Sequence, residues 1–503
     1  MSITASGSPP STGGLARGAI GLREVVFQSI THMAPAMAVA FSITFGITFG
    51  GGATPLAVVL ALLGSLFCAI AIGQLAKHLP SAGSFYTYTS RGIHPSAGFL
   101  VAWVYALVEP LVAPILYLQL GYVMAQYVHP ELGWSPDLWW IWSLAAAAIV
   151  FLLGYLGIQI STRTGTILGI FEVGVFAVLA VWLIVEAGDR NTLEVFTTDF
   201  ANIPGQEGIG GVFAASVYTI LAFIGFEAAA PLAEEAKDPQ RTVPRAVVLS
   251  CVVVGAYYVL TTYGATVFFG PERMGEFGTG WVDLARAVWG VGWILVVLAM
   301  INSAIANANA SSNAATRTLF AMGRIRLLPA FLAQTHPRFR SPHVAVWIQL
   351  IVGVVATLWL GFGWGMATEM DPFTASFVIA TSLVVGLVPI YILVNLACIL
   401  FYARERRDEF SMLKHVLIPV LGIIAFVPGF LAGAGLKVFD FIIPLEWPLT
   451  LGSLIVAIWV ALGIVYLIVL YATNRQRITD TARVFIEDDS AAEAARGSTV
   501  GPS

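Results

Sequence analysis

The sequence predicts an all-α membrane protein with twelve transmembrane helices, built as two inverted repeats of five followed by two more. Three observations support this fold class. Of the 503 residues, 58% are apolar and only 11% are charged, and the mean hydropathy is +0.84. A spanning helix needs about 20 apolar residues, and the chain offers twelve such runs. The lysines and arginines gather on one side of these runs, and two of the runs are interrupted in corresponding places.

Run lengths and turn signals place the individual spans. They are expected at 24–49, 56–78, 95–127, 138–157, 164–187, 211–233, 244–270, 283–310, 343–362, 373–402, 413–434 and 447–471. Residues 1–20 are rich in Ser, Gly and Pro and lack the cleavage site of a signal peptide. The tail 473–503 is polar, so both flanks are predicted to be disordered.

The distribution of basic residues predicts the orientation. With the N-terminus in the cytoplasm and twelve spans, 21 of the 25 Lys and Arg residues fall on the inner side. The outer segments hold only Arg190, Arg273, Arg286 and Lys437. This bias fits the positive-inside rule with both termini cytoplasmic.

The stretch 208–245 contains the clearest interruption. Most residues from Val212 to Phe226 are apolar, and Glu227 then follows two residues after Gly225. A charge inside the bilayer is costly unless it faces protein or water. Glycine frees the backbone, and Pro231 lacks an N–H. These residues predict a broken helix that lines a cavity. A kinked structural helix with Glu227 paired to a neighbour explains this stretch alone equally well.

A second interruption lies five spans earlier. Pro35 stands in the middle of the first span, among the small residues of THMAPAMA. An odd number of spans between two copies gives them opposite topology. Paired broken helices in two halves are typical of inverted-repeat transporters, whose binding site lies at the breaks.

Three stretches carry a resemblance to a known family. They are AFIGFEAAAPLAEEAKDPQRTVPRAV at 222–247, LPSAGSFYTYTSRGIHPSAGFLVAW at 79–103 and ASSNAATRTLFAMGRIRLLP at 310–329. The first resembles the sixth helix and following loop of the amino acid–polyamine–organocation superfamily. The second is similar to that family's loop between helices two and three, and the third to the end of its helix eight.

The resemblance implies a LeuT-like fold and the uptake or exchange of amino acids or related amines. The repeats would then occupy 21–207 and 208–402, with the last two helices in 403–472. One departure concerns the first break, where many relatives have a Gly-x-Gly pattern. This chain has Met33-Ala34-Pro35-Ala36-Met37, and Pro35 offers no N–H to a substrate carboxylate.

Substrate-binding residues are predicted at both breaks. Free N–H groups at the start of a half-helix suit a carboxylate, and free carbonyls at an end suit an ammonium group. The breaks are adjacent if the resemblance holds. The predicted residues are Met33, Ala34, Pro35, Ala36, Met37, Phe223, Ile224, Gly225 and Phe226. For the two phenylalanines, packing against lipid or core is the favoured alternative.

Ionisable residues inside the spans are candidates for coupling or gating. They are His32, Glu109, Glu172 and Glu227. Burial favours the protonated form of a carboxylate, so Glu172 is predicted to bind the coupling proton, with a structural hydrogen bond to a neighbouring helix as the alternative. By resemblance, some proton-driven relatives carry a lysine near this place, where sodium-driven relatives bind sodium. For Glu109 and Glu227, packing or gating competes evenly with substrate contact. His32 is predicted to be a hydrogen-bonding residue that faces the bundle.

Span eight is unusually polar. Asn302, Asn309 and Asn313 share one helical face, which favours hydrogen bonds between helices. Ser311 and Ser312 are candidate ligands for a cation, with helix association favoured over that role. Loop charges such as Glu234 and Glu235 are predicted to be solvated, with pairing as an inner gate left open.

The predicted function is secondary active transport of amino acids across the plasma (inner) membrane, driven by protons or by exchange. The expected partners are a small amino acid or amine, a coupling proton with sodium as an alternative, and the bilayer. No nucleotide-binding, metalloprotease or nucleophile-elbow motif occurs, so no enzyme activity, cofactor, metal or nucleic acid is predicted. Two alternatives stay open. One is a polyamine or organic-cation importer, and the other is a membrane sensor, although the tails are too short for a folded output domain.

Overall fold

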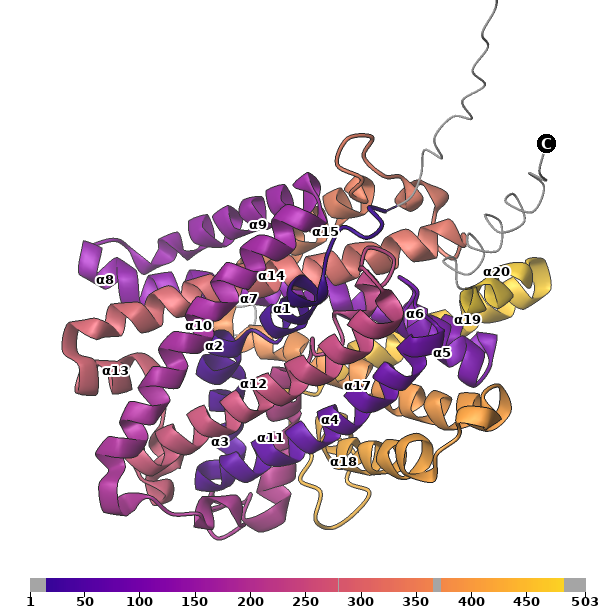
Figure 1. Ribbon diagram of the computed structural model, residues 1–503. Coiled ribbons are helices and arrows are strands. Elements are labelled where there is room, and N and C mark those ends of the chain that lie inside the picture. The colour runs from indigo at the N-terminus through magenta and orange to yellow at the C-terminus, as the bar shows by residue number, and fades with distance from the viewer. Residues whose placement is uncertain (1–14, 279, 365–371, 484–503) are drawn as a thin grey trace, which may run out of the picture.

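The computed structural model describes residues 15–278, 280–364 and 372–483, and its described residues are helices and connecting segments (Figure 1). The helices are α1 Leu22–His32, α2 Pro35–Met37, α3 Thr44–Gly50, α4 Thr54–His78, α5 Phe85–Gly92, α6 Pro95–Val108, α7 Val112–Val123, α8 His129–Leu132, α9 Trp139–Leu156, α10 Ile158–Ala187, α11 Gly208–Phe223, α12 Pro239–Phe269, α13 Trp281–Trp289, α14 Trp293–Arg324, α15 His343–Leu358, α17 Pro372–Arg404, α18 Ile418–Gly433, α19 Leu451–Thr473 and α20 Gln476–Thr479.

The all-helical fold class is confirmed. Among the described residues, 10 helical runs are long and apolar enough to cross a membrane. One of them, Leu22–His78, has 57 residues and covers two of the predicted spans. The shorter apolar helix α11 stands where the sixth span was predicted. The count of twelve crossings stays a prediction.

Of two predicted spans that differ in detail from the structure, one has a wrong boundary, for a physical reason. The span predicted at 95–127 is confirmed as one helical run, Pro95–Leu132, in which Pro110 lies in a 3₁₀ turn, Glu109–Leu111, between α6 and α7. The span predicted at 283–310 extends further, since α14 continues to Arg324. Small residues such as Ala314 and Ala315 are good helix formers and keep this extension packed.

The predicted disorder of the flanks is also partly wrong. Ile20 pairs with Ala236 in an isolated parallel bridge. Near the other end, residues 476–482 form helical turns, and buried Thr481 hydrogen-bonds Ser90. The rest of the predicted disorder, at 1–14 and 484–503, lies outside the described residues.

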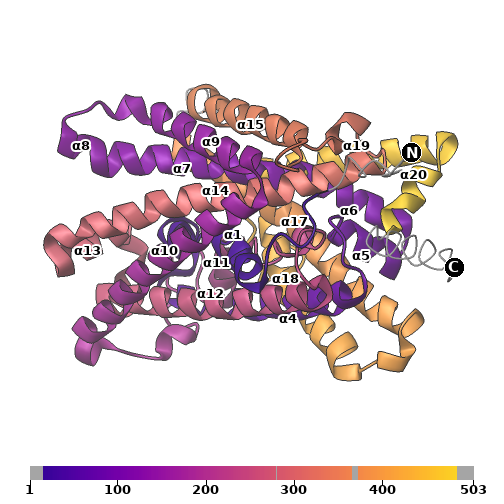
Figure 2. The same cartoon turned by 45° about the horizontal axis from the view of Figure 1, so that its top comes forward.

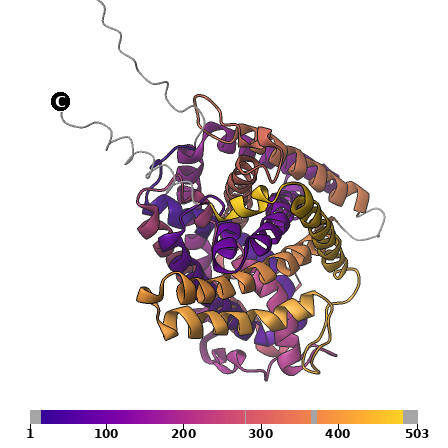
Figure 3. The same ribbon diagram turned by 90° about the vertical axis from the view of Figure 1, so that its right-hand side faces the viewer.

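The broken first helix lies at the centre of the bundle. Figure 1 shows α1 and α2 near α10, α12 and α14, Figure 2 shows α1 among the same three helices, and α1 packs against all three. Helices α18 and α19 lie toward the side that faces the viewer in Figure 3. Close packing depends on small residues: a Cβ on Gly255 of α12 would lie 2.1 Å from Leu62 of α4. This arrangement places the interruption of the first helix in the protein interior.

Candidate functional site at two broken helices

The first helix is interrupted at Met33 and Ala34. α1 ends at His32, and Ala34 has left-handed backbone angles, φ 48 and ψ 61. The helix resumes at Pro35, which suits a first helical position because the N–H it lacks would be unpaired there. From Pro35 the helical run continues through a π turn and α3 to Gly50. The predicted break in span one is therefore confirmed.

The second interruption follows Phe223. Ile224 has φ -55 and ψ 127, and Gly225 has φ 112, a conformation that side chains disfavour. Turns then lead to a short 3₁₀ helix, Ala230–Leu232. The predicted break near Gly225 is confirmed as well.

The two breaks face each other. A Cβ on Gly225 would lie 2.7 Å from the carbonyl carbon of His32. The Tyr258 hydroxyl is within hydrogen-bond distance of the carbonyl oxygens of Met33 and Ala222. The N–H of Ala229 donates to Ser29 Oγ at 3.0 Å. Three contacts thus join segments that are about 200 residues apart in sequence.

Replacing Gly225 with Ala is expected to reduce substrate uptake by at least about tenfold, because the new Cβ collides with the backbone of His32 and meets a positive φ. Uptake into proteoliposomes measures the effect. Gly174→Ala is the matched control, since Gly174 lies on the exposed face of α10 with no atom within 4 Å of its added Cβ. Equal uptake by the two variants would contradict the assignment of the Gly225 break to the functional site.

A cavity of about 50 Å³ lies at the breaks. Its lining includes the predicted residues Met33, Ala34, Met37 and Ile224, together with His32. The other lining residues are Ala38, Ser42, Val112, Ile115, Leu116, Gln119, Leu221, Asn307 and Leu383.

The two phenylalanines predicted to bind substrate pack against other aromatic side chains. Phe223 lies edge-on to Tyr258 with ring centroids 5.1 Å apart, and Phe226 lies 5.3 Å from Tyr391. Both side chains are buried, and neither lines the cavity. This matches the favoured alternative for single aromatics.

The four predicted ionisable residues all lie beside the breaks and are buried. His32 Nε2 is 3.4 Å from Glu109 Oε1, although the pair lacks hydrogen-bond geometry. Glu227 accepts from the N–H of Gly225 at 3.1 Å and from the Tyr391 hydroxyl at 2.9 Å. Its carboxylate therefore stabilises the turn after α11.

Glu172 reaches the first break from α10. Its Oε2 accepts from the N–H of Ala36 at 3.4 Å, and the next N–H, of Met37, donates to Ser303 Oγ at 3.2 Å. These groups belong to the first turn of the resumed helix, where unpaired N–H groups attract negative charge. Glu172 thus occupies the position that suits an anion.

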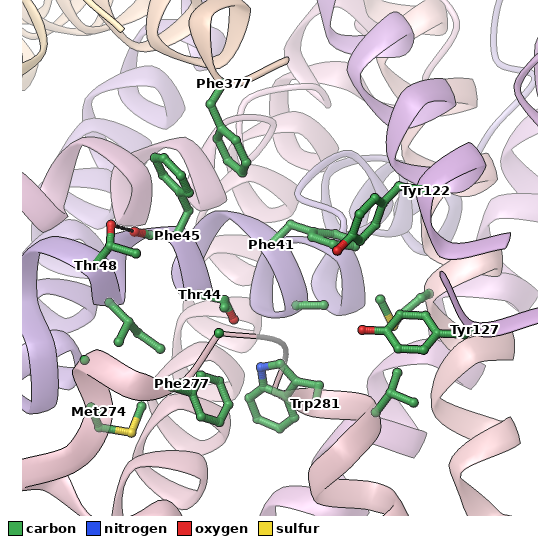
Figure 4. Close-up of a pocket in the computed structure, with 16 residues that line it drawn as sticks. Phe41, Thr44, Phe45, Thr48, Tyr122, Tyr127, Met274, Phe277, Trp281 and Phe377 are labelled. Atoms are coloured by element: carbon green, nitrogen blue, oxygen red, sulfur yellow. Dashed lines mark hydrogen bonds between the residues drawn. The ribbon is translucent and has the colours of Figure 1, made fainter. Parts of the chain in front are cut away.

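A wider vestibule lies about two helical turns further along the bundle. It has a volume of about 120 Å³ and an aromatic lining (Figure 4). Phe41 and Phe45 line it on one side, and Phe277 and Trp281 on another. Phe45 also stacks on Phe377 with ring centroids 4.0 Å apart. On α14, Met300 lines the vestibule and Asn307 lines the cavity, so the two levels are about 10 Å apart along that helix.

The opposite end of the bundle, which we call the arginine-rich end, is closed by ion pairs. Arg317 Nε donates to Glu235 Oε2 at 2.9 Å, and both side chains are buried. Arg324 NH2 donates to Glu234 Oε1 at 2.6 Å. The prediction that Glu235 is solvated is wrong, because the extension of α14 covers it and because Ala19 N–H donates to its backbone carbonyl.

The asparagines of α14 join helices, as expected. Asn302 donates to the Leu168 carbonyl, Asn309 exchanges hydrogen bonds with Ser161, and Asn313 donates to Ser161 Oγ. The cation role considered for the two serines near span one stays a prediction. Ser311 donates to the carbonyl of Ala308, and Ser312 lines a separate small cavity with Tyr117. Within the described ranges, no cluster of His, Cys, Asp and Glu has metal-site geometry.

Sequence reasoning missed Tyr258 and Tyr391. Each is a hydroxyl group in the middle of an apolar helix, and such groups need a buried hydrogen-bond partner. That requirement is a usable signal, but it does not name the partner.

Comparisons with known proteins place this architecture in a family. The sequence profile of the family "Amino acid permease" matches residues 24–481. The low-affinity putrescine importer PlaP of Escherichia coli K12 is 26% identical over 455 residues, which are 88% of this chain and 91% of the importer. The branched-chain amino acid permease BcaP of Bacillus subtilis is 27% identical, over 59% of this chain and 65% of the permease. The serine/threonine exchanger SteT of the same species is 23% identical, over 61% of this chain and 69% of the exchanger. The three relatives are named as transporters. The chain therefore belongs to the amino acid permease family of the amino acid–polyamine–organocation superfamily.

Proposed function

We propose that this permease is a secondary active transporter that moves an amino acid or a related amine across the plasma membrane by alternating access. The observation that carries the proposal is the meeting of two broken helices around a buried cavity, with the vestibule on one side and the arginine-rich end on the other. Irregular backbone at membrane depth is tolerated where it lines a cavity, and in transporters such breaks hold the solute.

The two ends suggest the state of the cycle. A volume of about 50 Å³ holds only one or two water molecules, so a solute enters only after the helices separate. The vestibule lies on one side of the cavity, whereas two ion pairs bridge the arginine-rich end on the other. With the positive-inside orientation, the arginine-rich end is cytoplasmic and the chain is closed toward the cytoplasm.

The repeat architecture is part of the same proposal. Residues 21–207 and 208–402 form the two inverted halves, each beginning with its broken helix, and 403–472 adds two helices. The run Leu22–His78 supports two crossings: at 57 residues it would measure about 85 Å if straight, well beyond a hydrocarbon core of about 30 Å. It turns at Gly51, which has φ 53.

We assign the coupling of proton binding to solute transport to Glu172. A buried carboxylate takes up a proton more readily than an exposed one. Its Oε2 contacts the backbone at the break, so protonation weakens the hydrogen bond from Ala36 and links proton binding to helix geometry. Exchange of two solutes is the alternative, as the similarity to an exchanger suggests.

The test is uptake into proteoliposomes that hold the purified full chain. Labelled leucine, serine, threonine and putrescine are each offered with a pH gradient, with a sodium gradient and with no gradient. Uptake of at least one solute that rises with the pH gradient supports the proposal. Absence of transport for the whole panel under every gradient would overturn it.

A further inference from the structure

The start of the resumed first helix is occupied by the chain's own side chains. The helical run Pro35–Gly50 begins with a proline, so its first available N–H groups are those of Ala36 and Met37. These donate to Glu172 Oε2 at 3.4 Å and to Ser303 Oγ at 3.2 Å. A helix start favours an anion through its N–H groups and its dipole. Here α10 supplies that anion.

We propose that Glu172 takes the place of a substrate carboxylate, and that the solute is therefore an organic amine without a carboxylate, such as an aliphatic diamine. This inference rests on the proposed function, because it names the substrate class of the same cavity. It also assigns Glu172 a role in specificity in addition to coupling.

Buried acceptors beside the cavity provide an independent observation. Glu109 is fully buried beside His32 and the Tyr105 hydroxyl, and neither of its carboxylate oxygens meets hydrogen-bond geometry with a described residue. The Oδ1 of Asn307, which lines the cavity, lacks a partner by the same criterion. A buried acceptor without a donor is costly. An ammonium group carries three N–H donors and no acceptor, so it satisfies such a set.

The charges around the cavity have the same sign. Glu109 and Glu172 approach the breaks from a 3₁₀ turn and from α10, Glu227 belongs to the second break itself, and none of the residues that line the cavity is Lys or Arg. The ends of α1 and α11 add the partial negative charge of their carbonyl groups. A carboxylate on the solute would either displace Glu172 or lie beside a like charge. An ammonium group avoids both costs.

Matched pairs of solutes test the inference. Ornithine is putrescine with one added carboxylate, and lysine is cadaverine with the same addition. Dissociation constants for the four compounds are measured on the purified full chain by ligand-induced thermal stabilisation. The wild type is expected to bind each diamine at least about tenfold more tightly than its amino acid partner, and Glu172→Ala is expected to reduce that ratio by at least about tenfold.

Glu186→Ala is the control, since this residue lies on the same helix at an exposed position. It is expected to leave the ratio unchanged. If the alanine variant at 172 fails to fold, Glu172→Gln replaces it, and a reduced ratio in that variant supports the proposal.

Two results would overturn the inference. One is tighter binding of ornithine, lysine or leucine than of the diamines by the wild type, with transport intact. The other is an unchanged ratio in both variants at 172. Failure of the proposed function gives a different result, because no solute is then transported under any gradient. In that case the proposed substrate class is refuted as well.

Discussion

Glu172→Gln is expected to abolish the acceleration of uptake by a pH gradient while the exchange of internal for external solute continues. Glutamine keeps an oxygen that accepts the hydrogen bond from Ala36, but it cannot bind or release a proton. The geometry of the break is therefore retained, whereas proton coupling is lost. Gradient-driven uptake of labelled solute into proteoliposomes should decrease by at least about tenfold, and counterflow should stay within about threefold of the wild type.

The matched control is Glu186→Gln, which makes the same chemical change on the exposed part of α10. It should respond to the gradient like the wild type. Retained gradient-driven uptake by Glu172→Gln would remove Glu172 from the coupling mechanism. Loss of counterflow together with gradient-driven uptake would assign it to binding alone.

Arg317→Met is expected to open or destabilise the arginine-rich end. The substitution leaves Glu235 buried and without its partner, a change that typically costs about 3–5 kcal/mol. A cost of that size changes a two-state equilibrium by more than about a hundredfold. The measurement is the rate at which a polar maleimide labels an Ala236→Cys reporter, because Ala236 is buried against the Ile20 bridge in the closed state.

Two further variants separate the buried charge from other effects. The double variant Arg317→Met/Glu235→Met removes both charges and should return the labelling rate most of the way to that of the reporter alone. Arg273→Met breaks an exposed pair with Glu276 and should change the rate little. If the Cys reporter at 236 is labelled no faster in Arg317→Met than in Arg273→Met, the Arg317–Glu235 pair does not close this end.

The breaks could be predicted because their causes are local. Proline cannot donate a hydrogen bond and glycine tolerates a positive φ, so Pro35 and Gly225 mark interruptions without knowledge of the fold. Glu227 could be recognised for a similar reason, since a carboxylate inside an apolar run needs donors nearby. The structure provides these donors in Gly225 and Tyr391.

The partners could not be predicted, because they come from distant parts of the chain. Nothing near Glu172 in the sequence indicates that its carboxylate contacts Ala36, which is 136 residues earlier. The burial of Arg317 likewise depends on Glu235, 82 residues away, and on a helix that continues beyond its expected end. A charge at the end of an apolar run has the same local pattern whether it is solvated or paired.

The amino-acid sequence by itself determined that this chain is helical and membrane-embedded, that two helices are broken, and which ionisable groups lie inside the apolar runs. Those properties follow from composition, periodicity and the backbone chemistry of single residues. Only the tertiary structure decided which groups meet at the breaks: Glu172 at the helix start, His32 beside Glu109, and Tyr258 across both interruptions. Hydrogen bonds and charge pairs act over a few ångströms in space, and packing of the helices sets those distances.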